Sequence, residues 1–111
     1  MAKQALSGPT IWIENAANLS AVVSATNGAA VETRWYKNIS VFVNVSVNTG
    51  AVTVNIEASH DGSNWFNLDS KTYTAATGTD IFGYSSHFPH MRTTTTTQSN
   101  STVTTTITGR N

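Results

Sequence analysis

The sequence predicts an all-β fold, an antiparallel two-sheet β-sandwich, and three observations carry this prediction. Apolar and polar residues alternate with a period of two in several stretches, whereas no segment keeps a helical period over three turns. Residues that favour turns separate these stretches at short intervals. About eight to ten short strands in one small domain imply two packed sheets, of jelly-roll or immunoglobulin-like type.

The N-terminal part is expected to begin as an extended arm. Residues 1–10 contain Gly8-Pro9 and have little reason to fold alone, so we expect a single sandwich domain over residues 11–111. Short strands are expected at 10–14, 19–25 and 31–36, with a turn at Asn27-Gly28.

The clearest alternation lies between residues 39 and 59. The apolar positions are Ile39, Val41, Val43, Val45 and Val47, then Val52, Val54, Ile56 and Ala58. Folding this stretch about Thr49-Gly50 pairs Val45 with Val54 and Val43 with Ile56, which predicts a hairpin with one apolar face. Phe42 is the exception, because it falls among the polar residues of the other face.

Downstream, Asp61-Gly62 predicts a tight turn that leads into a returning strand at 65–68 and completes a meander. Further strands are expected at 71–75 and 80–86, followed by a segment whose Pro89 suits a strand end.

The threonine-rich tail, residues 92–111, is predicted to be a second hairpin rather than a disordered linker, since threonine is β-branched and favours strands. A loop at Gln98-Ser99-Asn100 would place Asn100 in a left-handed conformation. It would pair Met91 with Ile107, Thr93 with Thr105 and Thr95 with Val103, and would leave the other threonines facing outward.

The composition excludes several classes of function. Charged residues make up 11% of the chain, against roughly 25% in an average soluble protein. Six basic and six acidic residues form no run, so nucleic acid is not an expected partner. No apolar run reaches the roughly 18 residues of a membrane span, and the start lacks a signal peptide, so we expect no membrane partner and synthesis in a cytoplasm. Weak charge favours residence in an assembly.

The residues that could carry chemistry do not form a convincing catalytic or metal site. His60, Asp61 and Ser63 are the residue types of a hydrolytic triad, but they crowd into one turn and are expected to be solvated there. His87 and His90 have no third ligand near in sequence. We therefore expect no enzyme, no cofactor and no metal.

Two kinds of binding surface remain open. Five aromatic residues could build a sugar-stacking platform, although most aromatics of a small sandwich belong to its core: Trp12, Trp35, Phe42, Trp65 and Tyr84. The alternating Thr102, Thr104, Thr106 and Thr108 are similar to an ice-binding array, but only one strand carries them. Phe42 marks a contact unless a neighbouring loop covers it.

The order of features "SVFVNVSVNTGAVTVNIEASHDGSNWFNLDS", "TGTDIFGY" and "HFPHMRTTTTT" resembles small β-sandwich virion proteins of tailed bacteriophages, especially capsid decoration (cement) proteins. The resemblance covers about two thirds of the chain. It implies a homo-oligomer, a trimer or dimer, that binds the major capsid protein and stabilises the capsid surface of the virion. N-terminal arms of that family often contact the shell, so the candidate partner contacts are Leu6, Pro9, Trp12 and Phe42.

A second interpretation is a carbohydrate- or receptor-binding sandwich of a phage tail or cell surface. The segment "SHDGSNW" is also similar to a turn of discoidin-type carbohydrate or lipid modules, which are longer than this chain.

Overall fold

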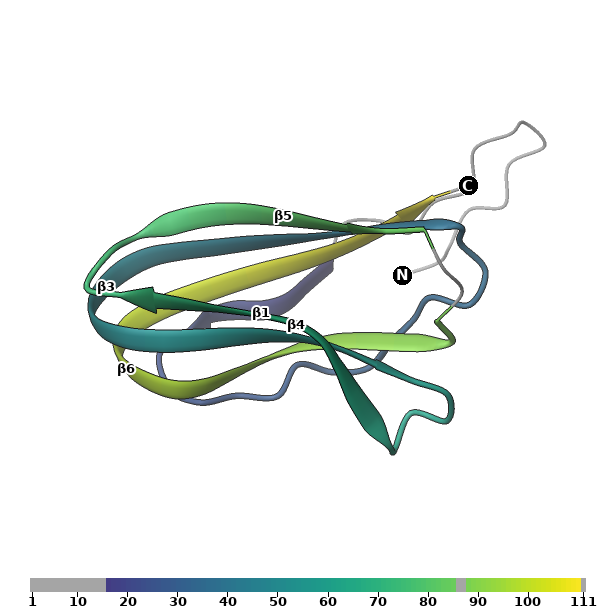
Figure 1. Ribbon diagram of the computed structural model, residues 1–111, viewed down its shortest axis with the longest axis horizontal. Helices are drawn as coiled ribbons and strands as arrows, with labels where there is room; N and C mark the ends of the chain where they lie inside the picture. The colour runs from purple at the N-terminus through teal and green to yellow at the C-terminus, as the bar shows by residue number, and fades with distance from the viewer. Residues whose placement is uncertain (1–15, 86–87, 111) are drawn as a thin grey trace.

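The computed structural model describes residues 16–85 and 88–110, and in this part of the chain all regular structure is antiparallel β (Figure 1). The strands are β1 (Ala16–Val22), β2 (Val31–Glu32), β3 (Asn38–Ser59), β4 (Trp65–Thr74), β5 (Gly78–Tyr84) and β6 (His90–Arg110). The all-β sandwich predicted from the alternating pattern is therefore confirmed. The predicted arm and the strand at 10–14 lie outside the described residues.

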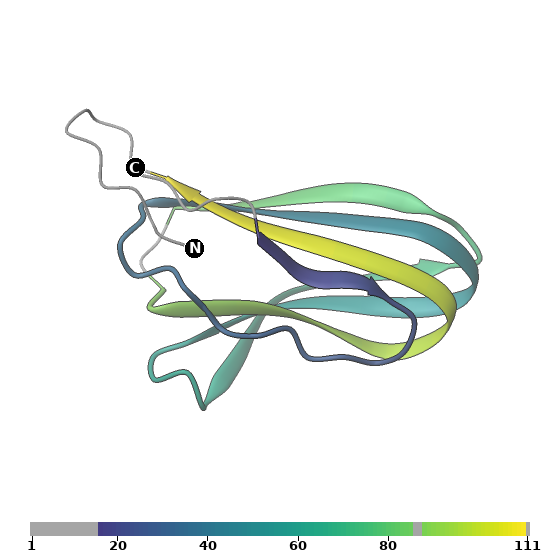
Figure 2. The ribbon, with the colours of Figure 1, turned by 180° about the vertical axis from the view of Figure 1, so that it is seen from behind.

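Two long strands, β3 and β6, determine the architecture. They pair with each other from Asn38 opposite Arg110 to Ser59 opposite His90. Both bend at the same end of the molecule, where the register shifts, and then run back (Figures 1 and 2). The two halves of each strand consequently belong to opposite layers of the sandwich.

In the first sheet, β5, the first half of β3, the second half of β6 and β1 lie side by side. The second sheet contains β4, the second half of β3, the first half of β6 and β2. If each half of β3 and of β6 is counted separately, the described chain contains eight strand segments, numbered in chain order. Apart from the pairing of β3 with β6, segment 1 pairs with 8, 2 with 7, 3 with 6 and 4 with 5. This nested pairing is the jelly-roll arrangement rather than the immunoglobulin-like one.

The bend requires unusual backbone at a few positions. Thr97 and Asn100 have φ of 52° and 46°, so the left-handed conformation predicted for Asn100 is confirmed. Gly50 lies against the other long strand, because a Cβ there would be 2.4 Å from the carbonyl oxygen of Ser99. Only glycine allows the two strands to approach this closely at the corner.

The two predicted hairpins are wrong. Val45 pairs with Val103 instead of Val54, and Met91 pairs with Ala58 and Val31 instead of Ile107. The halves of each strand face each other across the core, as shown by the 2.6 Å hydrogen bond between Thr93 Oγ1 and Thr105 Oγ1. The predicted pair Thr93 and Thr105 is therefore brought together, but through the packing of two layers instead of through a ladder of backbone hydrogen bonds.

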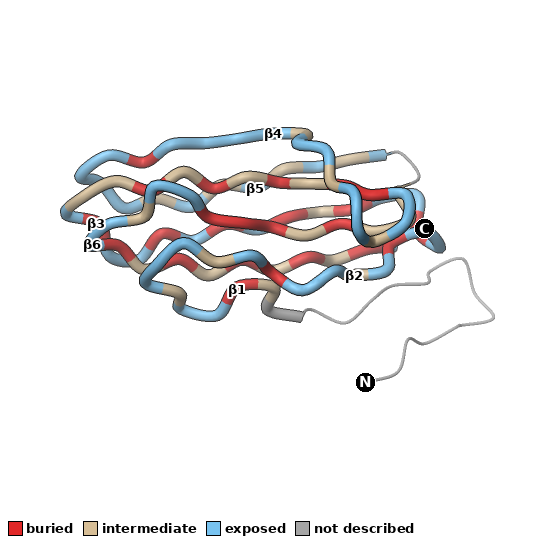
Figure 3. The backbone as a smooth tube through the Cα atoms, turned by 90° about the horizontal axis from the view of Figure 1, so that it is seen from below, coloured by how far each residue is buried: buried red, intermediate tan, exposed pale blue. Residues whose placement is uncertain are grey.

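The core lies between the sheets and is built mainly from aliphatic rows. Buried residues alternate with more exposed ones along the long strands (Figure 3). The largest fully buried side chains include Tyr36, Leu19, Ile39, Ile56, Met91 and Ile107. Trp35 departs from the expected core position and is 59% exposed.

The remaining segments follow the predicted pattern with different bounds. The expected strands at 65–68 and 71–75 form one strand, β4, and only two residues of 31–36 belong to a strand, β2. The turn at Asp61-Gly62 is confirmed, with φ of 81° at Gly62. Thr94 points to the outer side of its sheet, as expected, where it accepts a hydrogen bond from Asn55, but it is buried there, and Asn27 forms a β-bridge with it.

Candidate functional site

The outer side of the first sheet exposes apolar side chains in a polar surface. Phe42 of β3 lies between Ile81 of β5 and Thr106 of β6, and paired residues of antiparallel strands point to the same side. Ile81 is 67% exposed and Phe42 43% exposed. No neighbouring loop of the described chain covers Phe42. Its side chain is therefore available for contact, which is the condition that the sequence analysis set for a contact role.

The surface around these two residues is hollowed. A hollow of about 520 Å³ is lined by Phe42, Val43, Asn44, Thr79, Asp80, Ile81, Thr104 and Thr106. A second hollow, of about 410 Å³, lies towards the bend and is lined by Val23, Val47, Thr49, Asn100, Ser101 and Thr102. Val23 and Val47 are also more than half exposed. We call the two hollows together the Phe42 face.

The polar side chains that point outward on the Phe42 face are uncharged, and three of them keep their hydrogen-bonding capacity. The rows across the three strands are Ile81, Phe42 and Thr106, then Thr79, Asn44 and Thr104, then Val47 and Thr102. Among the described residues, Asn44, Thr79 and Thr106 make no side-chain hydrogen bond. Asp80 borders the hollow, but its carboxylate accepts a hydrogen bond from Tyr73 of the other sheet.

The outer side of the second sheet has the opposite character, because its polar side chains bind one another. The Asn55 amide donates to Thr94 and Thr96 at 3.3 Å each and accepts from Ser70 at 2.7 Å. Thr53 and Thr72 share a hydrogen bond of 2.9 Å across two strands. We call this surface the Asn55 face.

One end of the Asn55 face carries charged and aromatic residues. Arg92 Nε lies 2.8 Å from Glu57 Oε1, and the Arg92 guanidinium lies 4.3 Å from the centre of the Trp65 ring. Trp65, expected in the core, thus lies on an outer face with a cation over it. Trp35 donates to Glu32 at 3.4 Å. These contacts hold the two tryptophans against charged groups and assemble no sugar-stacking platform with Phe42.

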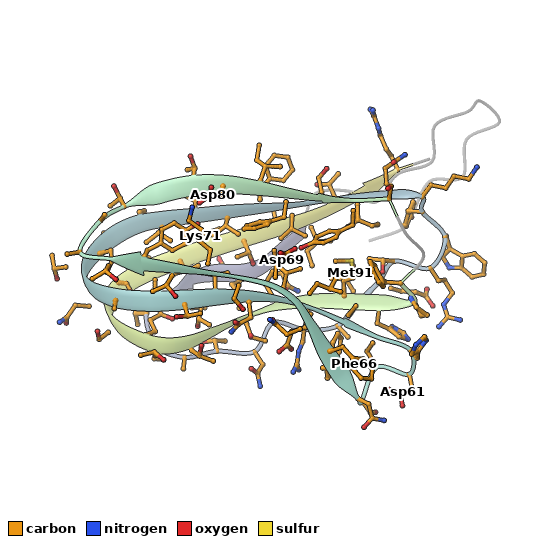
Figure 4. All side chains as sticks on the ribbon, viewed as in Figure 1. Asp61, Phe66, Asp69, Lys71, Asp80 and Met91 are labelled. Atoms are coloured by element: carbon orange, nitrogen blue, oxygen red, sulfur yellow. The ribbon has the colours of Figure 1, made fainter. Side chains whose placement is uncertain are left out.

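Polar side chains also close the open side of the sandwich between β4 and β5 (Figure 4). Tyr73 donates to Asp80 at 2.5 Å, Tyr84 donates to Asp69, and Lys71 Nζ lies 3.6 Å from Asp80. Burial, together with the neighbouring carboxylates, raises the pKa of both tyrosines well above the ordinary value. Inward-pointing charges of this kind protect edge strands from pairing with other chains.

The turn with triad-like residue types has a structural role. Asp61 Oδ1 accepts from the backbone N–H groups of Ser63 and Asn64 at 2.8 Å each, and these bonds hold the Asp61 pKa well below its usual range. The His60 ring packs edge-on against Phe66 at 6.5 Å between centres. Asp61 therefore fixes the turn and does not orient His60 for catalysis.

Of the sequence-predicted contacts, only Phe42 can be placed. Leu6, Pro9 and Trp12 lie outside the described residues, as does His87. No group of three or more His, Cys, Asp or Glu side chains within the described ranges is arranged to hold a metal ion. Sequence reasoning missed Ile81, because its place beside Phe42 depends on the pairing of β5 with β3.

Comparisons with known proteins found similarity in structure only. No family model matches the chain, and no curated protein matches it. A structure described as the crystal structure of PirA has a TM-score of 0.50 and 12% identity, covering 97% of this chain and 98% of its own. This likeness supports the fold alone.

Two further solved structures are similar at lower scores. A structure described as CBM4 has a TM-score of 0.45 and 18% identity, covering 97% of this chain and 71% of its own. An appendage of Bacillus endospores, described as forming disulfide-linked pili, has a TM-score of 0.48 and 12% identity. The match covers 99% of this chain and 95% of that one.

Within residues 16–85 and 88–110, no helix is long and apolar enough to cross a membrane.

Proposed function

We propose that this domain is a non-catalytic structural module that docks through the Phe42 face onto protein subunits of a larger assembly. The form of assembly that the sequence resemblance implies is a phage capsid, with the domain as a decoration protein bound to the major capsid protein. In that role it acts as a dimer or trimer at the capsid surface.

The observation that carries the proposal is the grouping of exposed apolar side chains on one uncharged face. Val23, Phe42, Val47 and Ile81 are four of the exposed large apolar residues of the described chain, and all four line the two hollows of this face. Phe42 and Ile81 are neighbours on paired strands, and exposed apolar side chains that gather among polar ones are typical of protein interaction sites. The lack of charge suits a contact whose central part loses its water.

Binding to capsid shells tests this proposal. We expect purified protein to bind shells that lack it and to raise the temperature at which they rupture, and we expect the Phe42→Ser, Ile81→Ser double variant to lose both effects. Trp35→Ser is the matched control, because Trp35 is 59% exposed but lies outside the Phe42 face. Failure of the unmodified protein to bind, or full binding by the double variant, would exclude docking by this face. The mass in solution gives the oligomeric state.

A second candidate is binding of a neutral carbohydrate in the larger hollow. It is favoured by one observation, the placement of an exposed aromatic ring beside an amide and hydroxyl groups that have no hydrogen-bond partner among the described residues: Phe42, Asn44, Thr79 and Thr106. A ring can stack on a sugar while such groups replace its water.

A glycan array separates the two candidates. Carbohydrate binding predicts specific retention of neutral glycans that is lost in Asn44→Ala, a substitution with little effect on an apolar protein contact. Protein docking predicts no retention of glycans and the loss of shell binding in the apolar double variant.

A further inference from the structure

A second exposed apolar site lies at the opposite end of the molecule from the bend. Leu68 is an extra residue in the pairing of β4 with β3, since Ile56 pairs with Asp69 and Glu57 with Asn67. Such a bulge bends its strand. The first part of β4 accordingly turns away from the body of the sandwich, carrying Phe66 with it (Figure 4).

An apolar slot lies beside this bend, between the end of β3, the start of β4 and the segment that leads into β6. Its volume is about 270 Å³, and it is lined by Ala58, Ser59, His60, Phe66, Leu68, Phe88 and Pro89. Phe66 is 60% exposed, and its ring packs edge-on against His60. Sites for drug-sized ligands occupy about 300–1,000 Å³, so this slot suits one bulky side chain better than a small molecule.

Two carboxylates belong to residues that directly follow lining residues in the chain, Asp61 after His60 and Asp69 after Leu68. Asp61 accepts a hydrogen bond from Ser59 at 3.0 Å, and the turn holds its carboxylate in the charged form. Asp69 accepts from Tyr84, whose ring packs edge-on against Phe88. Arg92 and Arg34 are each paired with another carboxylate, Glu57 and Glu32, and Arg34 also lies 3.4 Å from the His90 ring.

We infer that this slot binds a single bulky apolar side chain of a protein partner, presented by a segment that carries lysine or arginine beside it. The apolar walls account for the anchor residue, and the two carboxylates account for the basic neighbours. The site is distinct from the Phe42 face and shares none of its residues.

Nuclear magnetic resonance titration with two matched peptides tests the inference. The isotope-labelled protein is titrated at low salt with acetyl-Lys-Trp-Lys-amide and with acetyl-Glu-Trp-Glu-amide. We expect the basic peptide to shift the resonances of residues 58–60, 66, 68 and 88 and to bind at least about threefold more tightly than the acidic one. Phe66→Ala should weaken its binding by about tenfold, whereas Ile81→Ala should leave it unchanged.

Three results would overturn the inference: equal binding of the two peptides, shifts that centre on another surface, or unchanged affinity in a folded Phe66→Ala variant. If that variant fails to fold, the shift map of the unmodified protein and the comparison of the two peptides still decide the outcome.

Discussion

The two outer faces of the sandwich are built from the same residue types but use them differently. On the Asn55 face, an asparagine and its neighbouring Ser and Thr side chains bind one another across three strands. On the Phe42 face, Asn44 occupies the equivalent place in the other half of β3 and makes no such bond within the described chain. One face therefore contributes to the stability of the domain, while the polar groups of the other keep their hydrogen-bonding capacity.

Substitutions on the inner sides of the sheets should have the largest effect on stability. There the two sheets do not differ, because the inner sides of both are buried in the core. Val43 and Ile56 are buried in opposite sheets, at 2% and 1% exposure. An unpaired charge in such a place costs several kcal/mol, comparable with the whole stability of a small domain. Val43→Asp and Ile56→Asp should each prevent folding, as judged by circular dichroism. A soluble variant that unfolds cooperatively would contradict the described core.

A matched pair of asparagine substitutions tests the contrast directly. Asn55→Ala removes three hydrogen bonds and leaves the buried hydroxyl of Thr94 without its donor, so it should lower the free energy of unfolding by about 1–2 kcal/mol. Asn44→Ala should change it by less than about 0.5 kcal/mol. Urea unfolding of both variants measures the difference, and equal losses would show that the two faces do not differ in this way.

Two arginine substitutions sharpen the comparison within one end of the molecule. The Arg92 and Glu57 side chains are only 20% and 19% exposed, and Arg92 also packs over Trp65. Arg34 and Glu32 are 42% and 44% exposed, so water screens their attraction. We expect Arg92→Ala to cost about 1 kcal/mol and Arg34→Ala less than about 0.5 kcal/mol. Thermal unfolding at low and high salt gives both values.

The smallest expected effect is that of pH on the stability of the domain. It does not distinguish the two faces, because the Tyr73 and Tyr84 hydroxyls donate to Asp80 and Asp69 between β4 of one sheet and β5 of the other. Their pKa values are raised in the folded state, whereas the pKa of tyrosine in the unfolded chain is about 10. Above that pH the unfolded state binds fewer protons, so stability should fall as pH rises. Tyr84→Phe should flatten this fall, measured as the denaturation midpoint between about pH 9 and 11. An unchanged slope would contradict the role of these bonds.

The sequence predicted which side chains face inward but not how the strands are connected. The alternation correctly placed Val43, Ile56, Met91 and Val103 in the core. It could not distinguish a hairpin from a bent strand, because folding a strand back either edge to edge or layer over layer brings the same residues together. The bend depends on the backbone conformations near Asn100 and on the close approach at Gly50, and both involve a second long strand.

The candidate site was predictable only in part, for a related reason. Phe42 was visible as an apolar residue at a polar position of its strand. Ile81 and Val47 became part of the same surface through strand pairing and a register shift, neither of which a period of two encodes. The expectation for Trp65 failed because the position of Arg92 over its ring arises between segments far apart in sequence.

The pairing of β3 with β6 has a consequence for how the protein is made. Partners in this ladder are separated by 31 residues at one end (Ser59 and His90) and by 72 at the other (Asn38 and Arg110). Each sheet contains half of β6, so neither sheet can close until β6 has paired. Folding should thus be slow for so small a domain, in the range of roughly milliseconds to seconds that is typical of non-local β pairing.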